Sequence, residues 1–157
     1  MIRRIPSVTQ GATCSGKDKD CTVRALANIT DMPYEKADWA LKAAGRTDNK
    51  GCSPRIWVPV YESFGIKMVS IFGKTGNALW FEYNYPSVPK CRSITVGKLI
   101  PTLSRTKTYA VVIKSHVFAV VGGCVIDTFD NRAQQQVIAL FELQENSEDV
   151  FKMKFVE

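Results

Sequence analysis

The sequence predicts an α+β fold, in which N-terminal helices are followed by a C-terminal antiparallel sheet. Before residue 65, apolar residues recur at helical spacing between capping and terminating residues, and after it β-branched and aromatic residues form short runs. Helices and strands that are separated along the chain are typical of α+β proteins. With 157 residues, the chain is expected to form a single domain, 1–157, around one core.

The first predicted helix begins at Cys21 and runs to Ile29. Apolar residues between these two positions repeat at helical spacing, and Asp20 stands where an N-cap residue is expected. Cys21 would therefore open this helix. The preceding residues, 1–20, are polar and contain glycine and serine, which predicts a flexible arm.

Two further helices are predicted over Pro33–Ala44 and Pro54–Phe64. Proline is favoured in the first turn of a helix, and a glycine that can end the helix, Gly45 or Gly65, follows each segment. Ser53 is expected to cap the third helix. The first third of the chain is thus predicted to be helical.

Strand-forming residues dominate after these helices. A loop-rich stretch from Phe72 to Arg92 is expected to hold one strand, at Leu79–Tyr83, and Thr95 is expected to cap a short helix that reaches toward Leu103. The other predicted strands are Ile66–Ile71, Thr108–Lys114, His116–Val121, Cys124–Phe129, Gln136–Leu143 and Val150–Val156.

The composition narrows the class of protein. A 45% hydrophobic fraction without an apolar run long enough to cross a bilayer predicts a soluble protein. The first residues lack the apolar stretch of a secretory signal, so a cytoplasmic location is expected. The five cysteines are scattered and form no CxxC pair, which argues against a disulfide framework or a zinc site. No metal or cofactor is expected.

The net charge of +6 is the one feature that the chain shares with nucleic-acid-binding proteins. Its Lys and Arg residues are spread along the whole sequence and form no block, so no nucleic-acid-binding surface is predicted. No membrane partner is expected either.

Cys21 is the candidate nucleophile. A thiol reacts as its thiolate, and the N–H groups and dipole at a helix N-terminus favour negative charge. Among the five cysteines, Cys21 is predicted to hold such a position. The others are interpreted as buried structural cysteines: Cys14, Cys52, Cys91 and Cys124.

The single histidine, His116, is the candidate base. It begins a predicted strand that ends at Gly122-Gly123, a two-residue hairpin signal. Such a hairpin pairs Val121 with Cys124 and places Asp127 on the sheet face of His116, diagonal to it. A carboxylate at that position is able to hold the imidazole ring.

This order of residues resembles that of the papain-like cysteine peptidases, in which a cysteine opens an early helix and a histidine strand follows much later. The segments Asp20–Ala27 and Ser115–Thr128 also resemble the cysteine and histidine boxes of small peptidase-like proteins that are common in bacteriophage genomes. The resemblance spans Cys21 to Thr128, and its specific part is the two boxes. It implies a papain-like fold, with the nucleophile helix packed on the sheet, and a protein or peptide substrate in the host cytoplasm.

The resemblance also implies a catalytic triad. Cys21 would attack a carbonyl carbon to form an acyl-enzyme, His116 would remove and return the proton, and Asp127 would fix the tautomer of the ring. Papain-like enzymes commonly use asparagine for the third role, which makes Asn131 the alternative orienting residue. The turn signal at residues 130–131 favours Asp127, because the strand is expected to bend away before Asn131.

One position departs from the papain-like pattern. In those enzymes a glutamine about six residues before the cysteine completes the oxyanion hole, and this position is Ser15 here. Gln10 is the nearest upstream glutamine and becomes the candidate, with the backbone N–H of Cys21 as the second donor.

Three functions remain open from the sequence. The leading one is hydrolysis of a peptide or isopeptide bond. A second is a papain-like binding module that has lost turnover and inhibits or adapts a host protein; whether Gln10 reaches the oxyanion hole would separate it from the first. A third is acyl transfer to an amine, as in transglutaminases, which uses the same three residues and differs in the acceptor.

Overall fold

A mixed β-sheet runs through the middle of the protein, with helices on both of its faces. The computed structural model describes residues 3–5, 20–47, 51–73, 78–126 and 133–144. The strands are β1 (Arg3–Ile5), β2 (Ile66–Phe72), β3 (Lys90–Cys91), β4 (Thr108–Ile113), β5 (His116–Val121), β6 (Cys124–Ile126) and β7 (Ala139–Leu143). Within the described residues these seven strands form one sheet in the order β1-β6-β5-β4-β7-β2-β3.

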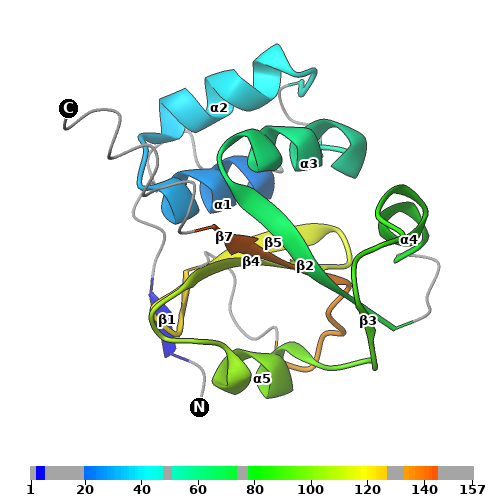
Figure 1. Ribbon diagram of the computed structural model, residues 1–157. Coiled ribbons are helices and arrows are strands. Elements are labelled where there is room, and N and C mark those ends of the chain that lie inside the picture. Colours follow the sequence, from blue (N-terminus) through cyan, green and yellow to red (C-terminus); the bar gives the residue numbers. More distant parts are fainter. Residues whose placement is uncertain (1–2, 6–19, 48–50, 74–77, 127–132, 145–157) are drawn as a thin grey trace, which may run out of the picture.

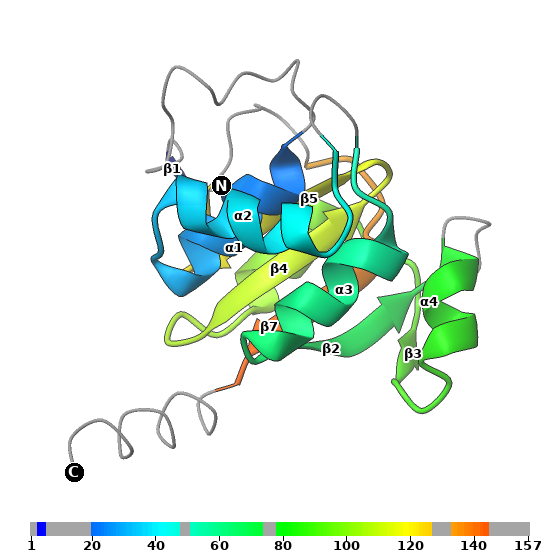
Figure 2. The same ribbon diagram turned by 90° about the horizontal axis from the view of Figure 1, so that it is seen from above.

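The helices lie in two unequal layers. They are α1 (Cys21–Thr30), α2 (Tyr34–Ala43), α3 (Pro54–Ser63), α4 (Leu79–Asn84) and α5 (Val96–Leu99), which a 3₁₀ turn extends over Ile100–Thr102. The first three cover one face of the sheet and α5 covers the other, while α4 lies beside β2 and β3 (Figure 1). Seen from above, α2 lies over α1, and α3 lies beside it over β2 (Figure 2). The α+β class is therefore confirmed.

The sheet is mixed, so the prediction of a purely antiparallel sheet is wrong. Strand β1 pairs with β6 in parallel, Arg3 opposite Cys124, and β2 pairs with β3 in parallel; the remaining pairs are antiparallel. Parallel strands need a crossover connection, and the segment that holds α4 provides one between β2 and β3. The expectation of a flexible arm over 1–20 fails for Arg3–Ile5, which form an edge strand, whereas residues 6–19 lie outside the described part.

The three predicted N-terminal helices are present. Ser53 caps α3 as expected, because its side chain accepts a hydrogen bond from the Arg55 N–H at 3.2 Å. Gly45 and Gly65 follow α2 and α3 with φ of +124° and +82°, conformations that side-chain-bearing residues rarely adopt. Helix α1 is buried from Thr22 to Ile29 on every side, rather than along one stripe.

The predicted strand at Leu79–Tyr83 is wrong: this segment forms helix α4. In a strand, residues 79, 81 and 83 would share one face. The structure instead buries Phe81, 2% exposed, against Trp57 and Phe141, and leaves Leu79 and Tyr83 on the outer side with 62% and 86% exposure. A helix places Phe81 on a different side from Leu79 and Tyr83, as a strand would not. The aromatic content of the segment does not by itself distinguish the two structures.

The other strand boundaries agree with the sequence to within a few residues. Thr95 stands at the start of α5, but its side chain makes no capping hydrogen bond. Strand β6 is described as far as Ile126, and the predicted strand Val150–Val156 lies outside the described residues. In the part of the chain that the structure describes, no helix combines the length and apolar character needed to span a membrane.

Alternation along the strands divides the buried residues between two cores. On the face that α1, α2 and α3 cover, Ala110, Val112, Val117 and Ala119 pack against α1 and α3. The alternate residues of the same strands, which include Val111, Phe118 and Val120, point to the opposite face and pack against α5. Both faces of β4 and β5 are therefore apolar, and these strands are fixed in the centre of the sheet.

We expect Leu26→Ala to lower the free energy of unfolding by about 2–5 kcal/mol, because Leu26 is completely buried in α1 and its removal leaves a cavity. The same change at Leu79, 62% exposed on α4, should cost no more than about 0.5 kcal/mol. Urea denaturation of both variants measures the difference. Equal losses would contradict the burial of α1.

Candidate active site

A cavity of about 600 Å³ opens at one end of the sheet, beside the first turn of α1. Its lining comes from the start of α1, the β4–β5 hairpin, the segment before α3, α3 and α4. Most of the lining is apolar. The lining residues include Asp20, Cys21, Thr22, Arg24, Cys52, Trp57, Phe81, Lys114, Ser115 and His116.

Cys21 lies half-buried at the first position of α1 and lines this cavity. The prediction that it opens a helix is confirmed. Its place in the first turn is secured from α3, because the hydroxyl of Tyr61 donates a buried hydrogen bond of 2.7 Å to the carbonyl of Thr22. The thiol therefore combines partial access with the positive end of a well-packed helix.

His116 lies at the start of β5 and lines the same cavity. It follows the two-residue turn Lys114-Ser115, in which Ser115 has a φ of +59°, and it pairs with Ile113 across the hairpin. Its ring stacks on Phe118, with centroids 5.8 Å apart and planes at 27°. Strand alternation gives His116 and Phe118 the same sheet face, opposite to the one that α1 covers. His116 nevertheless lines the cavity.

The hairpin register that the sequence predicted is confirmed. Val121 pairs with Cys124 and Val120 with Val125, and the pairing continues to Ala119 and Ile126. Asp127 is the next residue along the chain. It lies outside the described residues, as do Asn131 and Gln10, so their predicted roles stay predictions.

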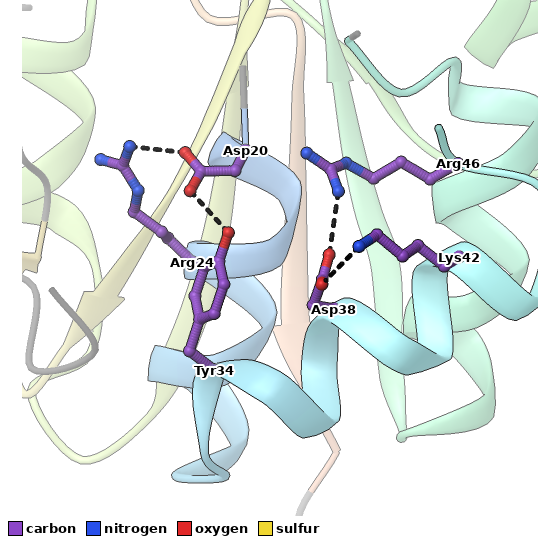
Figure 3. Close-up of polar contacts among 6 residues, drawn as sticks. All are labelled: Asp20, Arg24, Tyr34, Asp38, Lys42 and Arg46. Atoms are coloured by element: carbon purple, nitrogen blue, oxygen red, sulfur yellow. Dashed lines mark hydrogen bonds and ion pairs between the residues drawn. The ribbon is translucent and has the colours of Figure 1, made fainter. Parts of the chain in front are cut away.

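Asp20 does not cap α1 as the sequence suggested. Its side chain makes no capping hydrogen bond, and its carboxylate, 1% exposed, turns instead to two other partners (Figure 3). Arg24 forms an ion pair with it at 2.5 Å, with a geometry that is not that of a well-aligned hydrogen bond. The hydroxyl of Tyr34, the first residue of α2, donates a hydrogen bond to the second carboxylate oxygen at 2.8 Å.

A second polar cluster on α2 lies next to this one. Asp38 binds Lys42 at 3.0 Å and Arg46 at 2.9 Å, and the Arg46 side chain is only 2% exposed (Figure 3). Burial raises the pKa of the nearby Cys52 thiol, and the Arg46 guanidinium opposes part of that rise. Cys52 thus lines the cavity as a second thiol, one that burial keeps in its protonated form.

The remaining cysteines are only partly as predicted. Cys124 is buried, as expected of a structural cysteine, whereas the prediction for Cys91 is wrong because the short edge strand β3 leaves it exposed. Cys52 is half-buried, and Cys14 lies outside the described residues. Among the described residues, no group of three or more His, Cys, Asp or Glu side chains is arranged to hold a metal ion.

Two features of the cavity were missed from the sequence. The spacing of Asp20 and Arg24, four residues apart, is a readable signal for an ion pair on one helix. Nothing in the local sequence indicates that Cys52 would approach Cys21, because that proximity depends on how α3 packs on the rest of the fold. Comparisons with protein-family models, with curated proteins and with solved structures found no match.

The free energy of unfolding should fall above about pH 10, the ordinary pKa of tyrosine, because of Tyr61. Burial raises the pKa of Tyr61 well above its usual value, and the negative charge that the nearby Cys21 and Cys52 sulfurs carry when deprotonated adds to this. The unfolded chain therefore loses the phenolic proton first. The stability that Tyr61 contributes is complete below about pH 10 and is lost as the pH rises toward the folded-state pKa.

Tyr61→Phe should weaken this alkaline loss, and at neutral pH it should cost about 1 kcal/mol because the hydrogen bond to Thr22 disappears. Urea denaturation near pH 7 and near pH 10.5 gives both values. Tyr83→Phe, on the exposed side of α4, is the matched control and should change neither. An unaltered alkaline slope in Tyr61→Phe would exclude the buried phenol as its source.

Proposed function

We propose that the protein is a cysteine hydrolase of papain-like type that cleaves a peptide or isopeptide bond. The observation that carries the proposal is that Cys21, at the N-terminus of a buried helix, and His116, at the start of β5, line one cavity. No other pair of a helix-opening cysteine and a histidine is found among the described residues. Both residues come from the segments that resemble the cysteine and histidine boxes of papain-like proteins.

The chemistry follows from these two positions. His116 accepts the thiol proton, and the first-turn N–H groups of α1 stabilise the thiolate. The thiolate sulfur attacks the carbonyl carbon, the C–N bond breaks, and His116 gives its proton to the leaving amine. Water then attacks the thioester with His116 again as base, which releases the acid and restores the thiol.

The surroundings of the two residues support this chemistry. Trp57 and Phe81 contribute apolar side chains to the lining, and an apolar lining strengthens electrostatic interactions within the cavity. The opening is large enough for a side chain and the flanking backbone of a peptide. In this proposal Asp127 orients His116 from the end of β6, and Gln10 donates to the oxyanion.

We expect Cys21 to be alkylated at least about tenfold faster than any other cysteine near pH 6, since a thiolate rather than a thiol reacts. Brief iodoacetamide treatment followed by peptide mass spectrometry measures all five sites at once. Cys91, which is exposed, is the internal reference for the effect of reagent access to a thiol. Equal labelling of Cys21 and Cys91 would remove the basis of the proposal.

Cys21→Ala should keep the thermal unfolding temperature close to that of the wild type and abolish cleavage. An unfolded variant would favour a purely structural role for Cys21.

The two candidates for the third catalytic role are separated by paired variants. Asp127→Asn should lower kcat/KM by about 10²- to 10⁴-fold without unfolding the protein, because the histidine loses the carboxylate that orients it. Asn131→Ala should change kcat/KM by less than about threefold, because in this assignment the asparagine does not orient the histidine. Cleavage of a mixed peptide pool, followed by mass spectrometry, provides the rates. A larger loss at Asn131 would reverse the assignment.

A further inference from the structure

The carboxylate of Asp20 presents an electrostatic problem for a nucleophile at Cys21. It belongs to the preceding residue, it lines the same cavity, and it is 1% exposed. A negative charge that close and that poorly solvated opposes formation of a second negative charge on the Cys21 sulfur. If Asp20 capped the helix, it would also occupy the N–H groups that a thiolate requires.

The structure resolves both difficulties through Arg24. One turn further along α1, the Arg24 side chain, 7% exposed, returns to the Asp20 carboxylate and contacts it at 2.5 Å. The pair carries no net charge. It also turns the carboxylate away from the first-turn N–H groups, and Asp20 makes no capping bond to them.

Helix α2 holds the pair in place. The Tyr34 hydroxyl satisfies the second carboxylate oxygen at 2.8 Å, so the anion is fixed between two helices (Figure 3). A buried ion pair contributes little to net stability, because desolvation of both charges offsets their attraction. Arg24 and Tyr34 satisfy the buried carboxylate, and their position beside Cys21 gives the pair a second consequence, for the charge around the nucleophile.

We propose that Arg24 is a positioning residue for Cys21, whose guanidinium compensates the buried Asp20 carboxylate so that the thiolate forms beside a neutral pair. The inference rests on the proposed function, since it concerns the same nucleophile. Among the described residues, the other charged or titratable groups around the cavity include His116 and Lys114 on the β4–β5 hairpin, Cys52 before α3, Tyr61 on α3, and Arg46 next to Cys52. Each of these groups stays unchanged in the variants below.

The test is the pH profile of Cys21 alkylation by iodoacetamide, measured in the full chain. Arg24→Gln leaves the carboxylate uncompensated, and the profile should move to higher pH by about one unit, or about a tenfold lower rate near pH 6. The double variant Asp20→Asn with Arg24→Gln removes both charges. Its profile should return to within about twofold of the wild-type rate.

The double variant distinguishes charge compensation from simple support of the helix. A structural role predicts that two substitutions disturb Cys21 at least as much as one, so a double variant as slow as Arg24→Gln would overturn the inference. Tyr34→Phe is the control for the hydrogen bond alone, because it leaves both charges in place. Its profile should keep the wild-type position, and a shift as large as that of Arg24→Gln would also overturn the inference.

Three further outcomes are informative. Should Arg24→Gln fail to fold, Asp20→Asn alone supplies the measurement. This change removes the negative charge and keeps the guanidinium, so the profile should move to lower pH, and a wild-type or higher position contradicts the inference. In the wild type, a Cys21 no faster than Cys91 refutes the proposed function itself. A fast Cys21 with an unchanged Arg24→Gln profile refutes the role of Arg24 and leaves the hydrolase proposal intact.

Discussion

The burial of the first turn of α1 is the constraint on which the rest of the structure depends. Helix α1 packs on β5 and β4 and under α2, so that even its polar residues lie inside the protein. A carboxylate in such a place requires charged or hydrogen-bonding partners, since the cost of leaving it unpaired is several kcal/mol. Arg24 and Tyr34 supply them, and through them α2 is tied to the same turn.

This constraint also explains how the cavity arises. The start of α1 is held by Tyr61 from α3 and by Tyr34 from α2, and the turn of the β4–β5 hairpin lines the cavity beside it. Most of the cavity lining is apolar. Cys21, Cys52 and His116 are gathered there although they are far apart in the sequence.

The electrostatics of the cavity follow the same pattern of paired charges. Asp38 binds the buried Arg46, and Arg46 in turn acts on Cys52. Two thiols thus line one cavity in different surroundings: Cys21 begins a helix, and Cys52 is held as a thiol by burial.

The sequence by itself determined the local structure: the three N-terminal helices, the start of α1 at Cys21, and the register of the β5–β6 hairpin. These features depend on capping residues, glycines and alternation within a few neighbouring residues. Tertiary structure decided the features that depend on distant contacts. Packing of Phe81 against Trp57 and Phe141 made residues 79–84 a helix rather than a strand, and the parallel pairs β1–β6 and β2–β3 made the sheet mixed. The burial of Asp20 likewise replaced an expected N-cap with an ion pair, because a buried carboxylate is costly unless its charge is paired.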